Sequence, residues 1–247
     1  MPDGRPWPRV SIVTPLLNHK PPIEETIRSI LLQGYPDIEH IVVDGGSTDG
    51  SLAVVGRYSS WVRCVVRKGG GQSAAVNFGL KESTGDLIGW QNSDDFYGPG
   101  SFQQAALAAA QYPESDIFNG MVRGFQGQNS QPPWLFESCY EFSQESLLNK
   151  MCVMNQSMFL RRRIFEQGVY LKDDLHFAMD QEFFWRLSFE GFRYRMVPSM
   201  IGYYRQHENA KSTTYNVAAT WSRMRCFAVY AGTNGSLGTC GGKCVRS

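Results

Sequence analysis

Short apolar runs alternate with longer amphipathic segments along roughly the first hundred residues of the chain. The apolar runs predict strands over residues 10–14, 39–44, 62–66 and 87–90. The segments with apolar residues three or four positions apart predict helices over residues 21–33, 49–58, 72–81 and 99–112. Strands and helices in this alternation form βαβ units, in which the strands run parallel and the helices cover both faces of the sheet. We therefore expect an α/β fold with a Rossmann-like, mostly parallel sheet flanked by helices.

The first of these helices has the clearest boundary signals. Pro21 and Pro22 suit the first turn of a helix, where the backbone N–H groups have no intrahelical partner. We expect Glu24 and Glu25 in the same turn, where the helix dipole favours acidic side chains. Gly34 suits the position just beyond the helix end.

The pattern becomes less regular after Pro113. The expected elements are a strand, a Gly- and Pro-rich loop, two helices and two short strands, over 117–122, 124–133, 161–167, 180–190, near 196 and 202–205. The Gly-rich end of the chain, residues 232–247, has no periodicity, and we expect it to be disordered.

Composition excludes several classes of protein. The net charge of +1 over 247 residues favours neither nucleic acid nor an anionic membrane as a partner. The sequence shows no signal peptide and no apolar run long enough to cross a bilayer. We therefore expect a cytoplasmic protein without a transmembrane segment, although peripheral association with the inner face of the membrane remains open. In that compartment the six cysteines are expected to be reduced.

Polar residues follow three of the predicted strands. Thr14 and Pro15 end the first strand, Asp44 ends the second, and Asn92-Ser-Asp-Asp95 follows the fourth. In an open parallel sheet the carboxyl ends of the strands form the ligand-binding edge. Acidic groups at that edge suit a divalent metal ion that carries a phosphate, together with contacts to a ribose or a base.

Several segments, in their order and spacing, resemble the inverting family 2 glycosyltransferases, which have the GT-A fold. They cover about residues 10–212 and are Val10-Ser-Ile-Val-Thr-Pro15, Val43-Asp-Gly-Gly-Ser-Thr-Asp-Gly50, Gly71-Gln-Ser73 with Asn77, Asn92-Ser-Asp-Asp95, Met179-Asp180 and Tyr204-Arg-Gln-His207. The resemblance implies a nucleotide-sugar donor, for which we expect a UDP-sugar, and Mn²⁺ or Mg²⁺ as cofactor. It also implies a glycan or a lipid-linked acceptor, in the synthesis of cell-surface polysaccharide or glycoconjugate.

The resemblance also assigns roles to individual residues. Asp95 is expected to bind the metal, His207 to bind the metal or the diphosphate, and Asp180 to be the general base. The expected contacts to the nucleotide-sugar are Thr14, Pro15, Asp44, Gly71, Gln72, Asn77, Asn92 and Asp94. On this basis we expect a single domain over residues 1–231, with a nucleotide-binding half over 8–112 and an acceptor and catalytic half over 113–231.

Structural roles compete with these assignments. The Asn92–Asp95 segment also has good turn chemistry. Asp49 and Asp180 also suit helix capping, and a histidine in a polar loop, such as His207, is usually a surface residue. The other histidines, His19, His40 and His176, are expected at the surface or at helix caps.

Four aromatic residues alternate with polar ones and suit either the core or stacking on an acceptor: Trp134, Phe136, Tyr140 and Phe142.

One segment departs from the family pattern. Gly69-Gly-Gly71 stands where relatives commonly have a charged residue before Gly-Gln-Ser, which affects how the base pocket is closed.

Two other functions stay open from the sequence. A nucleotidyltransferase would use a similar metal site, but residues 16–20 are a poor version of the Gly-rich basic loop that it needs. A non-catalytic nucleotide- or sugar-binding module would not need Asp94, Asp95 and Asp180 together.

Overall fold

The computed structural model describes residues 1–126, 134–138 and 153–207. The strands in these ranges are β1 (Val10–Leu16), β2 (Ile38–Asp44), β3 (Val62–Val66), β4 (Leu87–Trp90), β5 (Phe96–Tyr97), β6 (Ile117–Gln126), β7 (Trp134–Ser138), β8 (Met158–Arg161) and β9 (Tyr194–Gln206). The helices are α1 (Lys20–Leu31), α2 (Ser51–Gly56), α3 (Gly71–Glu82), α4 (Ser101–Gln111), α6 (Arg162–Glu166) and α7 (Met179–Phe189), with a 3-10 turn, η1 (Asn155–Ser157).

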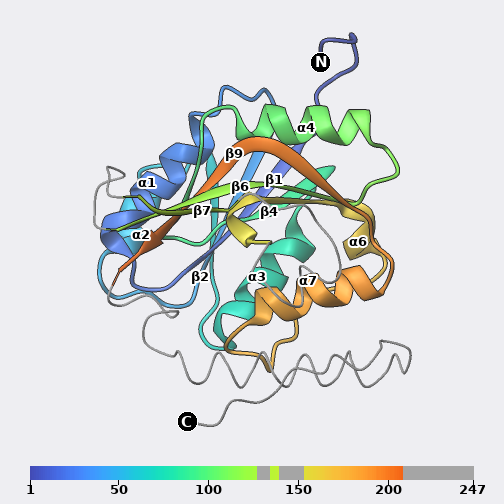
Figure 1. Cartoon of the computed structure of the whole chain (residues 1–247). Coiled ribbons are helices and arrows are strands. Elements are labelled where there is room, and N and C mark those ends of the chain that lie inside the picture. The colour runs from blue at the N-terminus through green and yellow to red at the C-terminus, as the bar shows by residue number, and fades with distance from the viewer. Residues whose placement is uncertain (127–133, 139–152, 208–247) are drawn as a thin grey trace.

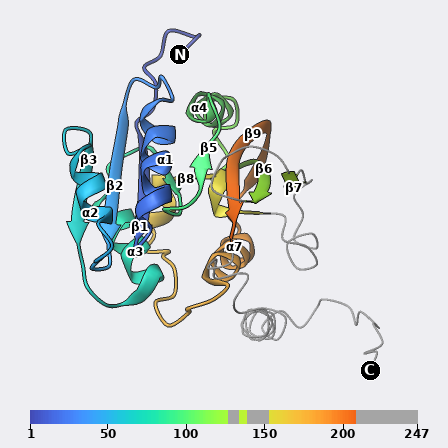
Figure 2. The same ribbon diagram turned by 90° about the vertical axis from the view of Figure 1, so that its left-hand side faces the viewer.

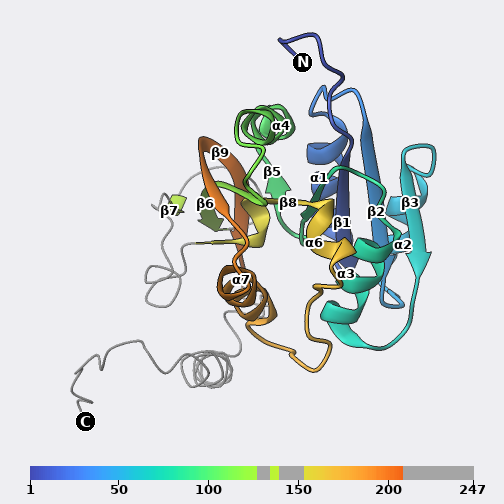
Figure 3. The ribbon, with the colours of Figure 1, turned by 90° about the vertical axis from the view of Figure 1, so that its right-hand side faces the viewer.

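The strands form one sheet in the order β3-β2-β1-β4-β8-β6-β9-β5, with β7 paired to β6. The first four strands in this order run parallel, as the βαβ pattern predicts. From β8 onward the sheet is mixed: β8 is antiparallel to β4 and β6, whereas β9 is parallel to β6. Figures 2 and 3 show β1, β2 and β3 at one end of the sheet and β6, β7 and β9 at the other.

Helices cover both faces of the sheet because the strand side chains alternate in direction. On β1, Ile12 packs in the cluster that includes α4, whereas Val13 packs in the cluster that includes α3 and α7. A third cluster joins α1 and α2 to β2. Figure 1 shows α4 and α7 on opposite sides of the sheet. The expected α/β architecture with helices on both faces is therefore confirmed.

The close approach of α3 to β1 depends on Gly79. A Cβ atom at this position would overlap with the side chain of Val13. The helix therefore lies closer to the strand than a residue with a side chain would allow.

The structure differs from the prediction at several elements. Three strands, β5, β7 and β8, are not among the predicted elements. Strand β6 extends to Gln126, into the predicted loop, because it pairs with β7 and β9. The two short strands expected near 196 and 202–205 are one strand, β9, whose pairing with β6 contains two register shifts. Helix α1 begins at Lys20, so Glu24 and Glu25 lie in its second turn and not in its first.

The predicted disordered tail, 232–247, lies outside the described residues. No helix in the described part of the chain is long and apolar enough to span a membrane.

His40 is buried, so the expectation of a surface or capping role is wrong for this histidine. It lies on β2 with 1% of its surface exposed, and its Nε2 lies 3.0 Å from the hydroxyl of Thr14 on β1. Burial lowers the pKa of His40 to about 3, so the imidazole is neutral in the folded protein. Since the unfolded chain binds a proton at this residue near pH 6.5, acid favours the unfolded state.

We expect His40→Gln to reduce the acid sensitivity of the fold. In the native protein the free energy of unfolding should fall by about 1.4 kcal/mol per pH unit through this residue as the pH drops below about 6.5. The glutamine variant should lose this slope, because its side chain does not titrate. Urea unfolding at several pH values between about 7 and 4 measures the slope. His176→Gln, at an exposed position, is the matched control, and equal slopes for His40→Gln and the native protein would contradict the assignment.

Candidate active site

The site lies where β1 and β4 end and where the last residues of β9 return to the same edge. Asp94 and Asp95 follow β4, and His19 lies in the connection from β1 to α1. His207 comes directly after β9. Because β9 runs beside β6, far along the sheet from β1, the chain needs the whole fold to bring His207 to this edge.

Asp95 is a buried structural carboxylate. Its Oδ1 accepts the backbone N–H of Arg205 at 2.8 Å. Its Oδ2 accepts N–H groups of the Gln156 side chain at 2.7 Å and of the Asn92 side chain at 3.0 Å. Burial, and next to it the charge of Asp94, raise the pKa of Asp95 to about 8, although these three hydrogen bonds oppose the shift.

Arg205 fixes the turn that contains both aspartates. Its Nε donates to the backbone carbonyl of Asp94 at 2.9 Å, and its guanidinium pairs with Glu25 of α1. The guanidinium also lies 4.8 Å from the ring centre of Phe125. Thr26 of α1 donates to the carbonyl of Asp95 at 2.7 Å, so α1 and β9 hold the turn from two sides.

Asp94 and His207 form the pair that remains accessible at the edge. Oδ2 of Asp94 lies 3.0 Å from Nε2 of His207, and their side chains are 15% and 27% exposed. Mg²⁺ binds its ligands at about 2.0–2.1 Å in near-octahedral geometry, so two neighbouring ligand atoms lie about 3.0 Å apart. The separation of these two atoms therefore fits a shared metal ion as well as a hydrogen bond.

The described residues contribute few metal ligands of their own. Across the described ranges, no group of three or more His, Cys, Asp or Glu side chains is arranged to hold a metal ion. A metal ion at Asp94 and His207 would therefore depend on oxygens of a bound diphosphate and on water, as is usual for Mg²⁺ beside phosphates.

His19 occupies the N-cap position of α1, as expected from the sequence, and it also belongs to the site. Its Nδ1 lies 2.7 Å from the hydroxyl of Ser93, and its ring meets the His207 ring edge-on at 6.4 Å between centres. It occupies the cap position of α1, but its side chain makes no capping hydrogen bond. No sequence signal indicates this role, because the partners are 74 positions away and beyond.

The predicted contacts at the ends of β1 and β2 are buried. Thr14 and Pro15 lie inside the sheet edge, with the Thr14 hydroxyl against His40. The carboxylate of Asp44 is fully buried and accepts the backbone N–H groups of Gly46 at 2.8 Å and Ser47 at 2.9 Å. Asp44 therefore organises the turn between β2 and α2 in this structure.

Asp49 has the structural role that competes with a ligand contact. It accepts the backbone N–H of Ser51, the first residue of α2, at 2.9 Å, and that of Lys20, the first residue of α1, at 2.8 Å. Burial opposes ionisation, but the hydrogen bonds from Ser51 and Lys20 lower the pKa of Asp49 on balance. The carboxylate joins the N-termini of the two helices.

The start of α3 faces the turn after β4. Gln72 donates to the side-chain oxygen of Asn92 at 3.1 Å, which also accepts from the indole of Trp90 at 3.2 Å. Three consecutive glycines with φ between 75° and 83° form the entry to this helix, ending with Gly71. This left-handed backbone explains the glycines where other residues were expected. Asn77 lies further along α3 and contacts the segment before α7.

Asp180 lies in the first turn of α7. The N-cap of this helix is Ala178, with φ of 53°, so Asp180 is not the capping residue. Its Oδ1 accepts the N–H of Gln181 at 2.9 Å, and its side chain is partly exposed. The next acid, Glu182, is buried and pairs with Arg186 at 2.9 Å and with Lys172 at 3.0 Å.

Two of the four aromatic residues proposed for acceptor stacking, Trp134 and Phe136, lie on β7. The other two, Tyr140 and Phe142, lie outside the described residues.

The mixed sheet with helices on both faces and the acidic edge at its parallel strands are those of a GT-A type fold. Residues 11–169 match the family model described as "Glycosyl transferase family 2". The chain belongs to this family, which confirms the resemblance seen in the sequence.

Named relatives agree with this membership. The chain is 28% identical over 215 residues to the uncharacterized glycosyltransferase EpsJ of Bacillus subtilis, covering 82% of this chain and 62% of EpsJ. It is 24% identical over 233 residues to the poly(ribitol-phosphate) beta-N-acetylglucosaminyltransferase TarS of Staphylococcus aureus, covering 90% of this chain and 40% of TarS. The chain thus spans only part of the relatives that it matches.

Solved structures show the same fold. S. aureus TarS in complex with UDP-GlcNAc has a TM-score of 0.75 at 21% identity, over 93% of this chain and 68% of that chain. The mannosyltransferase PcManGT from Pyrobaculum calidifontis, in complex with GDP-Man and Mn²⁺, has a TM-score of 0.62 at 18% identity, over 95% of this chain and 80% of that chain. The GT-A fold is confirmed by these likenesses.

We expect Asp95→Asn to destabilise the fold before any ligand is added. An amide nitrogen would replace one of two oxygens that accept three N–H groups, leaving at least one buried donor without its acceptor. The expected loss is about 1–3 kcal/mol in the free energy of unfolding. Urea unfolding without nucleotide or metal measures it. Asp94→Asn is the matched control at the neighbouring, more exposed position, and an equal effect of both substitutions would contradict the structural role of Asp95.

Proposed function

We propose that the protein is a metal-dependent inverting glycosyltransferase. It would move a sugar from a nucleoside-diphosphate donor to an acceptor hydroxyl. The observation that carries this proposal is the Asp94–His207 pair, 3.0 Å apart at the carboxyl edge of the parallel strands, in a member of family 2. An aspartate and a histidine paired at this edge could bind a divalent metal ion that is coordinated by the diphosphate of the donor.

The donor site we propose lies between the ends of β1 and β4 and the start of α3. The donor would contact Gly71, Gln72 and Asn92 directly. The buried residues Thr14, Pro15 and Asp44 would shape this edge from inside the sheet. The bound UDP-GlcNAc of TarS, whose fold is similar, supports a UDP-sugar as donor. The N-terminus of α3 adds the positive end of a helix dipole on the diphosphate side.

Asp94 and His207 would hold the metal, Mn²⁺ or Mg²⁺. The ion, when bound, offsets the negative charge that develops on the departing diphosphate. The Mn²⁺ in the complex of PcManGT supports Mn²⁺ as a cofactor of this fold. We propose Asp94 as the metal ligand rather than Asp95, which the sequence suggests, because both oxygens of Asp95 accept hydrogen bonds from the protein.

Asp180 would act as the general base. Its carboxylate would take the proton from the acceptor hydroxyl, which attacks the anomeric carbon from the side opposite the leaving diphosphate. Asp180 lies in the first turn of α7 and its side chain is partly exposed, so an acceptor hydroxyl could reach it. We propose a glycan or lipid-linked acceptor, and the similarity to TarS, a poly(ribitol-phosphate) beta-N-acetylglucosaminyltransferase, supports a polymeric acceptor.

We expect UDP to stabilise the protein only together with Mn²⁺. A ligand at a hundred times its dissociation constant adds about 2.7 kcal/mol to the free energy of unfolding. Thermal-shift measurements with UDP, GDP, CMP and dTDP, each with and without Mn²⁺, identify the nucleotide. The Mn²⁺-dependent part of the shift should disappear in Asp94→Asn. An equal response to UDP with and without the metal would exclude the proposed metal site.

We expect Asp180→Asn to leave nucleotide binding intact and to reduce turnover. Loss of a general base lowers rates by about 10²- to 10⁴-fold. Hydrolysis of UDP-GlcNAc to UDP and GlcNAc, with water in place of the acceptor hydroxyl, measures turnover through the release of UDP, and the thermal shift with UDP and Mn²⁺ measures binding. Near-normal turnover would remove Asp180 as the base, whereas loss of the thermal shift would indicate that Asp180 contacts the donor.

A further inference from the structure

The segment that leads into α7 has no helix or strand of its own. This lead segment, residues 170–178, connects α6 to the helix that carries Asp180. It ends at Ala178, whose left-handed backbone is unfavourable for a residue with a Cβ. Contacts with other elements must therefore hold it in place.

Asn77 of α3 makes three hydrogen bonds to this segment. Its side-chain N–H groups donate to the carbonyl of Leu171 and to the carboxylate of Asp173, both at 2.8 Å. Its side-chain oxygen accepts the N–H of Leu171 at 2.9 Å. An asparagine amide has only two N–H groups, and both are used here. Asn77 is also 94% buried, with 6% of its surface exposed, so it is poorly placed for the donor contact expected from the sequence.

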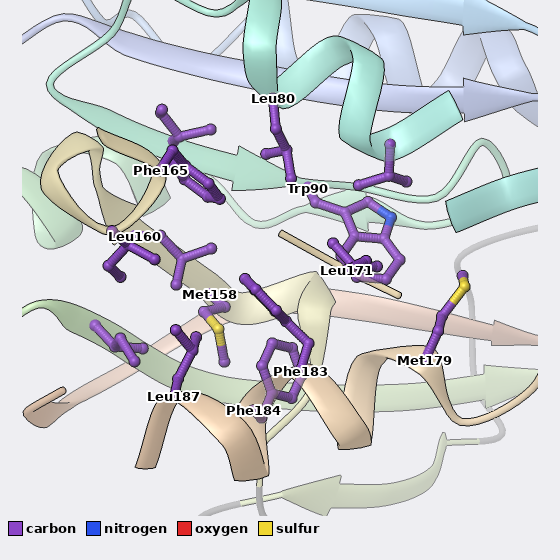
Figure 4. Close-up of a cluster of buried hydrophobic side chains, with 14 of the residues drawn as sticks. Leu80, Trp90, Met158, Leu160, Phe165, Leu171, Met179, Phe183, Phe184 and Leu187 are labelled. Atoms are coloured by element: carbon purple, nitrogen blue, oxygen red, sulfur yellow. The ribbon is translucent and has the colours of Figure 1, made fainter. Parts of the chain in front are cut away.

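Ser73 provides a second contact one turn earlier on α3. Its hydroxyl lies 2.9 Å from the carbonyl of Leu175 and 2.8 Å from the sulfur of Met179, the first residue of α7. Together, Ser73 and Asn77 hold both the start and the end of the lead segment. Figure 4 shows Leu171 and Met179 in the apolar cluster that they share with Leu80 of α3 and Phe183 of α7.

The same segment is tied to α7 from its other side. Buried Glu182 pairs with Lys172 of the lead segment and with Arg186, whose guanidinium also donates to the carbonyl of Tyr170 at 2.6 Å. The lead segment is thus held between α3 and α7. A shift of α3 would be transmitted to the turn that contains Asp180.

We propose that Asn77 and Ser73 are positioning residues that place Asp180 relative to the donor. This inference rests on the proposed role of Asp180 as base. The first turn of α3 reaches the donor edge through Gln72 and Asn92, and its next turns hold the lead segment. One rigid helix therefore sets the distance between the donor site and the base.

Asn77→Asp tests the proposal with almost no change in shape. The new carboxylate would face the carbonyl of Leu171 and the carboxylate of Asp173, and both contacts would become repulsive. We expect kcat for UDP release from UDP-GlcNAc with Mn²⁺ to fall by about 10- to 100-fold, the scale of a small misplacement of a catalytic group. The KM for UDP-GlcNAc should stay within about twofold, because the donor contacts are unchanged.

The double variant Asn77→Asp/Asp173→Asn should restore part of the lost kcat, because it relieves the repulsion at position 173 but not the one at the carbonyl of Leu171. It reverses the pair, so an amide at position 173 again donates to an oxygen at position 77. Asp173→Asn alone should have little effect, because its amide oxygen still accepts from Asn77. Asp174→Asn, at the exposed neighbouring position, is the matched control. Ser73→Ala is a milder second variant, with a smaller fall in kcat expected, should Asn77→Asp fold poorly.

Amide hydrogen exchange provides a readout that needs no donor. In Asn77→Asp, exchange at residues 171–180 should accelerate by about tenfold or more, while β1 and β2 keep their protection. Unchanged exchange in this segment would overturn the proposal.

The kinetic outcomes separate this inference from the proposed function. A raised KM with unchanged kcat would make Asn77 a donor contact, and a lower melting temperature with unchanged kcat would make it only structural. Either result overturns the inference while a low turnover of Asp180→Asn still supports the base. Normal turnover in Asp180→Asn would overturn the proposed base itself.

Discussion

The site depends on the hydrogen bonds that the buried side chain of Asp95 accepts. A buried carboxyl group whose oxygens lack hydrogen-bond partners is unfavourable inside a protein, so Asp95 is tolerated only when its donors are in place. They come from β9, 110 residues further along the chain, from η1 and from the turn itself. The arrangement of Asp94 and His207 is thus a consequence of correct assembly of the two halves of the sheet.

The residues of the site come from two parts of the mixed sheet. Its parallel half, β1 to β4, produces an edge where several strands end together, as in other open α/β sheets. The other half adds β9, at whose end His207 contacts Asp94, and α7, whose first turn contains Asp180. Arg205 and Glu25 join the halves through one ion pair between β9 and α1.

Helix α3 has a double role that its sequence does not reveal. Gln72 points toward the turn after β4, whereas Ser73 and Asn77 contact the segment before α7. These side chains look alike as polar residues of an amphipathic helix. Their partners are about 20 positions away for Gln72 and about a hundred for the other two, so only the assembled fold shows which side chain contacts the turn after β4 and which contact the segment before α7.

The sequence by itself determined the parallel half of the fold, because apolar runs and helical spacing are local properties. Strands β3 and β4 begin and end where the pattern predicts them. It also determined the family and the acidic edge, since motif residues lie close together along the chain. Tertiary structure decided the rest: that His40 is buried, that His19 meets His207, and that Asp94 is open while Asp95 is enclosed. Burial and hydrogen bonding depend on neighbours distant in sequence, and two adjacent aspartates acquire different roles only when those neighbours are in place.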